Sequence, residues 1–233
     1  MWRILLLAVA WFGLCATSIS AELTVRVVNE SDTALVDAVV FVPDRAKAGP
    51  PARGRGTIMQ RNRIFQPFVT VVQRGTAIAF PNDDPFMHHV YSFSHAKRFE
   101  IKLYKGTPAS PVVFDKNGVV VLGCNVHDWM IAYVLVVDTP IFEKTGKDGI
   151  ARFRDLPAGT HQLMVWYPGM REPAGMPQIT LAEGESRSIS HRLNTPIKRQ
   201  PPAPPFDPLR YSDSSPLLGK THQPGDVCVS PHS

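Results

Sequence analysis

The chain has 233 residues, enough for one or two domains with real hydrophobic cores, so neither disulfides nor a metal are required to stabilise it. Its 25 Lys and Arg against 20 Asp and Glu give a net charge of +5, scattered without a basic run, which argues against nucleic-acid binding. With 22 Pro, 16 Gly and only 19% charged residues, the composition excludes a coiled coil and is typical of a loop-rich, all-β protein.

Residues 1–21 have the pattern of a secretory signal peptide. One basic residue, Arg3, precedes an apolar run over residues 4–16, and the run gives way to polar residues before the small residue Ala21. A membrane-spanning helix needs about 20 apolar residues, so cleavage after Ala21 is favoured over the alternative of an uncleaved anchor. We therefore expect an exported protein with no membrane span after signal removal.

From residue 23 onward, short apolar or alternating runs are separated by Gly and Pro, which is the pattern of strands and turns. The spacing predicts a β-sandwich or Greek-key barrel, and no helical period of useful length or internal repeat is present. The expected strands cover residues 23–28, 38–42, 68–72, 77–80, 89–93, 112–114, 119–122, 131–137, 151–153, 162–166 and 179–181.

A cluster of soft metal ligands follows the expected strand 119–122. Cys124, His127 and Met130 have the spacing Cys-x2-His-x2-Met, which brings a thiolate, an imidazole and a thioether onto one turn. Thiolate and thioether select copper, and two His and one Cys with a weak axial Met form an electron-transfer copper centre. Zinc fits poorly, because Met is not among its usual ligands. Each residue alone is typical of a core, and only the combination indicates a metal.

The second histidine of such a centre has to come from upstream, where His88 and His89 begin an expected strand. Strand alternation places His89 on the face of Tyr91 and Phe93, which the pattern directs inward, whereas His88 shares a face with Val90. Alternation alone favours His89, but strands beside metal sites often contain a bulge, and a bulge favours His88. The residues by themselves leave both candidates open.

Two motifs carry a resemblance to a known family: Asn82-x-Asp84-x3-His88-x-Val90 and Cys124-x2-His127-x2-Met130. They resemble the cupredoxins, the blue copper proteins of the plastocyanin and amicyanin type. The wider run over residues 56–138 is similar to bacterial periplasmic proteins described as methylamine utilization or plastocyanin-like proteins. The resemblance implies a cupredoxin Greek-key β-sandwich, a periplasmic location and one mononuclear copper ion that alternates between Cu(I) and Cu(II).

The resemblance also assigns the metal ligands. It implies that Cys124 supplies the short copper–thiolate bond, His127 the imidazole at the solvent edge, Met130 the long axial contact and His88 the interior imidazole. In the family an Asn follows the first histidine and ties the two ligand loops together. His89 stands at that position here, so this hydrogen bond has no counterpart.

Residues 139–194 form a second expected unit. Their Asp148-Gly149 turn and the Pro157-Ala158-Gly159 segment resemble the carboxypeptidase regulatory-like, transthyretin-type β-sandwich. Residues 25–42 resemble the first two strands of that fold as well. We expect two consecutive domains, a cupredoxin domain over residues 22–138 and a small β-sandwich over 139–194. The alternative is a copper domain inserted into the second sandwich.

Residues 195–233 form a Pro-rich tail that we expect to be disordered, because few large apolar residues interrupt its prolines. Once Cys15 leaves with the signal, Cys124 and Cys228 remain in an oxidising compartment. Two cysteines do not make a disulfide framework. A bridge between them stays open from the sequence and would destroy the metal site.

Three functions follow from these features. The first is a periplasmic, monomeric electron carrier that meets a transient redox protein partner at an apolar edge formed by His127, Trp129 and Met130. The second is copper carriage or storage, which needs a labile, Met- and His-rich site. The third is a metal-free interaction module in which Cys124 is structural. An enzyme is not expected, because a filled axial position leaves no open coordination site, and no residue recognises an amine.

Overall fold

The structure, a computed structural model, describes residues 20–43 and 53–205. These residues contain nineteen strands and no helix, so the expected all-β class is confirmed. The described strands all belong to one compact unit of the chain, residues 1–203. The expected signal peptide and most of the expected disordered tail lie outside the described residues.

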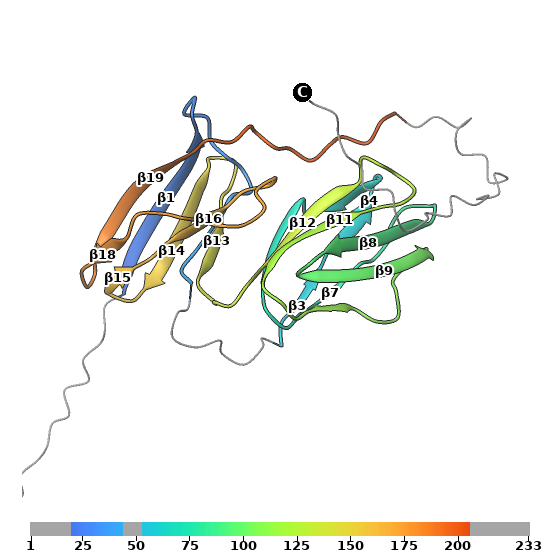
Figure 1. Cartoon of the computed structure of the whole chain (residues 1–233), viewed down its shortest axis with the longest axis horizontal. Coiled ribbons are helices and arrows are strands. Elements are labelled where there is room, and N and C mark those ends of the chain that lie inside the picture. Colours follow the sequence, from blue (N-terminus) through green and yellow to red (C-terminus); the bar gives the residue numbers. More distant parts are fainter. Residues whose placement is uncertain (1–19, 44–52, 206–233) are drawn as a thin grey trace, which may run out of the picture. The chain divides into compact units, whose positions relative to one another are not determined.

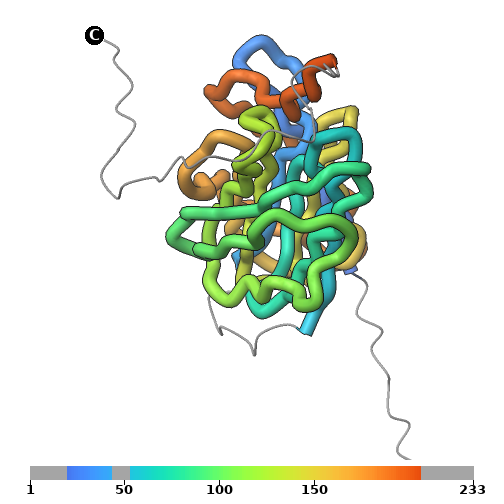
Figure 2. Tube along the Cα trace, turned by 90° about the vertical axis from the view of Figure 1, so that its right-hand side faces the viewer, coloured from blue at the N-terminus to red at the C-terminus, as the bar shows by residue number. Residues whose placement is uncertain are grey.

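The first strand of the chain pairs with the last ones. β1 (Ala21–Asn29) lies between β14 (Ile150–Leu156), to which it is antiparallel, and β19 (Ser186–Leu193), to which it is parallel (Figure 1). The tube view shows the blue opening segment beside the orange-red end of the described chain (Figure 2). Segments more than a hundred residues apart in the sequence thus form one sheet.

A second sheet completes this sandwich. It has the order β13-β2-β16-β17. Strands β15 and β18 form a separate two-stranded sheet. The strands are β2 (Val39–Phe41), β13 (Phe142–Lys144), β15 (Gly159–His161), β16 (Met164–Trp166), β17 (Ala174–Gly175) and β18 (Ile179–Leu181). We call residues 21–43 with 139–194 the split sandwich.

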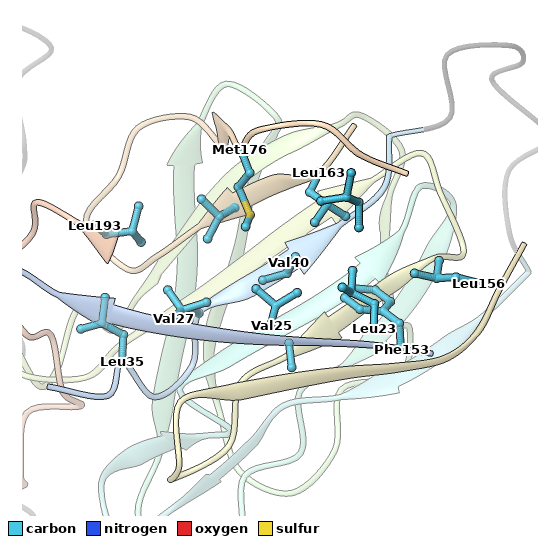
Figure 3. Close-up of a cluster of buried hydrophobic side chains, with 14 of the residues drawn as sticks. Leu23, Val25, Val27, Leu35, Val40, Phe153, Leu156, Leu163, Met176 and Leu193 are labelled. Atoms are coloured by element: carbon cyan, nitrogen blue, oxygen red, sulfur yellow. The ribbon is translucent and has the colours of Figure 1, made fainter. Parts of the chain in front are cut away.

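Alternation along β1 builds the core of the split sandwich. Leu23, Val25 and Val27 are completely buried, whereas the residues between them are at least partly exposed. They belong to one cluster with Val40 and Phe153 (Figure 3). Because the cluster draws side chains from both ends of the chain, the opening strands cannot bury their apolar face without residues 139–194.

The strand pairing therefore differs from the expected order of consecutive domains, 22–138 and then 139–194. Residues 21–43 pair with the later strands, in the arrangement that the sequence offered as its alternative, an insertion. The physical reason is that β1 and β2 find their partners only in β13, β14, β16 and β19. Residues 53–138, which we call the inserted sandwich, form sheets of their own.

The inserted sandwich has a five-stranded sheet of order β6-β12-β11-β8-β9, a three-stranded sheet of order β10-β7-β3 and a hairpin of β4 with β5 (Figure 1). Its strands are β3 (Arg55–Thr57), β4 (Met59–Arg61), β5 (Ile64–Gln66), β6 (Val69–Gln73), β7 (Thr76–Ala79), β8 (His88–Ser94), β9 (Lys97–Tyr104), β10 (Val112–Phe114), β11 (Gly118–Gly123) and β12 (Ile131–Val137). Its core cluster includes Phe80, Phe114, Leu122 and two residues of the expected metal site, Cys124 and Met130.

Candidate metal centre

Three donor atoms converge at one end of the inserted sandwich. His88 is the first residue of β8, Cys124 follows the last residue of β11, and His127 lies in the loop from β11 to β12. The Cys124 Sγ atom is 3.9 Å from His88 Nδ1 and 3.9 Å from His127 Nδ1. The three ligand atoms all lie within 4.8 Å of one another.

The spacing of these atoms fits a shared metal ion. Transition-metal bonds of about 2.0 Å to imidazole nitrogen and about 2.3 Å to thiolate sulfur add up to about 4.3 Å. This sum is slightly longer than the 3.9 Å between Sγ and each Nδ1. One ion can therefore bond all three atoms, with a bent nitrogen–metal–sulfur angle to each histidine. The same nitrogen, Nδ1, faces the sulfur in both histidines.

All three side chains are buried, which corrects one expectation. His127 is 0% exposed and therefore does not lie at the solvent edge of the site. The ring of Trp129 lies against it, with ring centroids 4.9 Å apart, and the ring of Phe86 lies 5.8 Å away. These two partly buried rings separate the imidazole from solvent. The expected apolar edge of His127, Trp129 and Met130 thus reduces to Trp129, because Met130 is 1% exposed.

The geometry of β8 distinguishes the two adjacent histidines. The pairing of β8 with β9 shifts register between His88 and Val90, as a bulge does, and His88 points into the site. His89 instead places its Nε2 atom 3.0 Å from Glu100 Oε1 and its ring against Tyr91. The inward direction expected for Phe93 is wrong, since this side chain is 70% exposed.

Asp84 fixes the proton on His88. Its Oδ2 atom lies 2.8 Å from His88 Nε2. Burial raises the pKa of Asp84, but hydrogen bonds from His88 and from the backbone N–H groups of Arg63 and Asn62 outweigh burial, and the net pKa is lowered. The ionised carboxylate can only accept a hydrogen bond, so Nε2 carries the proton and Nδ1 presents its lone pair toward Cys124.

Burial keeps both imidazoles neutral at pH 7. It lowers the pKa of His88, against the opposing effect of Asp84. It also lowers the pKa of His127 to about 4, helped by repulsion from the protonated form of His88 and from the Arg63 guanidinium. A neutral imidazole is the form that binds a metal ion, so neither histidine has to lose a proton at neutral pH.

Met130 lies in the same core cluster as Cys124. Its backbone N–H donates to the carbonyl of His127 at 2.9 Å, which closes the ligand loop into a turn. Cys124 is a free thiol in the part of the chain that the structure describes, and its expected alternative partner, Cys228, lies outside that part. All four residues expected as ligands are therefore buried in one region.

Sequence reasoning missed a polar pair beside the site, the buried Gln60 and the partly buried Tyr104. The Tyr104 hydroxyl donates to the carbonyl of Phe80 at 2.6 Å and accepts from the amide of Gln60. Burial raises the pKa of Tyr104 to about 12. The only signal in the sequence is a polar Gln in the middle of a short strand, which by itself is typical of an exposed position.

A pocket of about 440 Å³ opens on the outer face of the five-stranded sheet, next to Cys124 and Met130, the two expected sulfur ligands. Its lining includes Cys124 and Met130 on the inner side and the exposed side chains of Phe93 and Val121 on the outer side.

Comparison with known proteins finds similarity only among solved structures: no family model matches the sequence, and no curated protein matches it. A purple cupredoxin from Nitrosopumilus maritimus is 22% identical, covering 35% of this chain and 98% of that chain, with a TM-score of 0.32. A reduced Cu(I) form of an amicyanin mutant is 18% identical, covering 42% and 97%, with a TM-score of 0.33. A copper-containing nitrite reductase from Thermus scotoductus is 23% identical, covering 43% and 26%, with a TM-score of 0.34. At these identities, function has to be inferred from the site itself.

Among the described residues, no helix is long and apolar enough to cross a membrane.

Proposed function

We propose that this protein is a type 1 copper protein that carries single electrons. The observation that carries the proposal is the convergence of two neutral imidazole Nδ1 atoms and one cysteine Sγ atom in a buried site, each Nδ1 3.9 Å from the sulfur. Two His and one Cys, with a nearby buried Met, form the donor set of electron-transfer copper centres. Copper, when bound, supplies a one-electron Cu(I)/Cu(II) couple.

The side chains of this chain supply everything else that such a centre needs. His88, Cys124 and His127 hold the ion, and Met130 is the candidate axial ligand. Both imidazoles are already neutral, so the ion displaces only the thiol proton of Cys124. Burial of the whole set excludes water and holds the donors in one geometry, which suits an ion that changes charge without changing partners.

Two further parts of the proposal rest on the sequence. The signal-peptide pattern favours a periplasmic location, and the cupredoxin resemblance favours a transient redox protein as partner, with the protein acting as a monomer. A donor set of four side chains leaves no position for a substrate, which supports a carrier rather than an enzyme.

Copper storage is the weaker alternative. A storage site releases its ion readily and therefore needs exposed, exchangeable donors. Here His88, Cys124 and His127 are all buried, and among the described residues Met87, next to His88 in the sequence, is the one strongly exposed Met, at 53%. A metal-free module is weaker still, because it gives no reason for both Nδ1 atoms to face one sulfur.

The test is a visible absorption titration of the full mature chain with Cu(II). We expect an intense copper–thiolate charge-transfer band at one equivalent, absent from Cys124→Ser. Cys228→Ser is the matched control: it leaves the site cysteine in place and removes the only other thiol of the mature chain. A colourless protein in both the wild type and Cys228→Ser overturns the proposal, whereas colour in Cys228→Ser alone identifies a disulfide that blocks the site.

A further inference from the structure

The turn of the β4–β5 hairpin has an unusual backbone. Asn62 has a φ of 57° and Arg63 a φ of 58°, both in the left-handed region that residues other than glycine seldom adopt. Such a conformation is disfavoured for Arg, so contacts made by the turn have to stabilise it. The turn makes two sets of contacts, and each set leads to one of the two site histidines.

The first set leads to His88. The backbone N–H of Asn62 donates to Asp84 Oδ1 at 2.7 Å, and the N–H of Arg63 donates to Asp84 Oδ2 at 2.9 Å. The same Oδ2 atom accepts from His88 Nε2 at 2.8 Å. Asp84 is 6% exposed, so three donors share one buried carboxylate. The turn thereby fixes the carboxylate that orients His88.

The second set leads to His127. The indole Nε1–H of Trp129 donates to the carbonyl of Arg63 at 3.0 Å. The guanidinium carbon of Arg63 lies 5.9 Å from the centre of the Trp129 ring, and that ring packs against His127. The turn thereby holds the ring that covers the second imidazole.

We propose that the Asn62–Arg63 turn positions both metal-binding histidines, through Asp84 on one side and Trp129 on the other. The turn replaces the tie between ligand loops that His89 cannot make, since His89 faces Glu100 instead. Asp84 and Trp129 are positioning residues and do not touch the ion. The inference rests on the proposed function only in taking the two histidines as ligands.

Asp84→Asn tests the first contact without any metal. A carboxylate accepts three hydrogen bonds on two oxygens, whereas an amide has one oxygen and its NH₂ group has to face at least one of the three donors. In the metal-free protein at pH 7.5, a long-range ¹H–¹⁵N spectrum of the histidines reports which nitrogen is protonated. We expect His88 to carry its proton on Nε2 in the wild type and to shift toward the Nδ1-protonated form in Asp84→Asn.

Asp83→Asn is the matched control, because Asp83 is the neighbouring carboxylate but forms an exposed ion pair with Arg61. We expect its histidine spectrum to match the wild type. An unchanged His88 tautomer in a folded Asp84→Asn protein overturns the role of Asp84. This measurement does not depend on copper, so it stands even where the titration with Cu(II) fails.

Trp129→Phe tests the second contact, because Phe keeps a ring against His127 and removes the indole N–H. Loss of an outer contact to a metal ligand weakens binding about 10- to 100-fold, and we expect a loss in this range for Cu(II) in Asp84→Asn and in Trp129→Phe. Asp84 and Trp129 both act through one turn. The variant that combines Asp84→Asn with Trp129→Phe should therefore lose less Cu(II) affinity than the product of the two single losses. If the two losses of Cu(II) affinity simply multiply in the double variant, the proposal that one turn positions both histidines is wrong. It is also wrong if Trp129→Phe keeps the Cu(II) affinity and the charge-transfer band of the wild type.

Discussion

At the scale of single residues, His127 is the most informative group. It is fully buried, lies between the rings of Phe86 and Trp129, and has its pKa lowered from an ordinary 6.5 to about 4. The metal-free protein therefore keeps a neutral imidazole where the unfolded chain binds a proton. Because only the unfolded chain binds this proton, the free energy of unfolding depends on pH.

We predict that the metal-free protein loses stability as the pH falls from 6.5 toward 4. Across this window the unfolded state gains a proton at residue 127 and the native state does not, so the free energy of unfolding decreases with falling pH. For His127 alone the loss between pH 7 and pH 5 is roughly 2 kcal/mol. His88 acts in the same direction. Urea unfolding at both pH values measures the change.

His127→Gln removes one of the titrating groups, so its stability should depend less on pH over the same window. If the free energy of unfolding of His127→Gln depends on pH as steeply as that of the wild type, a group other than His127 is responsible.

The same residues show what the sequence can predict about the site. The spacing Cys-x2-His-x2-Met predicted that Cys124, His127 and Met130 lie together, because all three belong to one short loop. The upstream histidine could not be chosen from alternation, since a bulge between His88 and Val90 resets the face of the strand. The burial of His127 could not be predicted from the sequence either, because the Trp129 ring that covers it is held by the turn at Arg63, far away in the sequence.

At the scale of elements, most strands with regular apolar patterns were predicted, whereas two long strands rich in charged residues were missed. β9 has the sequence KRFEIKLY and β19 the sequence SRSISHRL, and both lie at the edge of their sheets. An edge strand often carries charged side chains, which weakens the alternating pattern and blocks pairing with other chains. Tertiary pairing, which local sequence does not encode, makes these segments strands.

One strand pair predicts a tight contact beside the site. Gly123 of β11 pairs with Tyr91 of β8, and a Cβ atom at position 123 would lie 2.8 Å from Tyr91 Cζ. We expect Gly123→Ala to lower the free energy of unfolding by about 1–3 kcal/mol, because the Tyr91 ring has to move. Urea unfolding of the metal-free protein measures the loss.

A double-mutant cycle identifies the cause. In a Tyr91→Ala background the obstructing ring is gone, so Gly123→Ala should cost clearly less. Gly56→Ala is the control, since its new methyl group meets only Ile78 at an ordinary 3.5 Å. The same cost in both backgrounds would show that the Tyr91 ring is not responsible.

At the scale of the whole molecule, the insertion follows from one register. Phe41 of β2 lies directly opposite Phe142 of β13 in an antiparallel pair. The chain thus leaves the split sandwich and returns to it at adjacent positions of one sheet, as in a hairpin with a very long loop. Insertions at such positions disturb the host fold little, because the loop ends are already close. The sequence offered this arrangement only as an alternative, since each half of the split sandwich is too short to identify alone.

Two fragments distinguish the arrangements. Residues 53–138 contain every strand of the inserted sandwich, whereas residues 21–138 add β1 and β2 without β13, β14, β16 and β19. In the longer fragment Leu23, Val25 and Val27 lose the core that buries them, so we expect it to aggregate more and to gain no stability over the shorter one. Size-exclusion chromatography and urea unfolding of both fragments measure this. If the chain were instead two consecutive domains, β1 and β2 would belong to the first, and the longer fragment would be the more soluble and the more stable of the two.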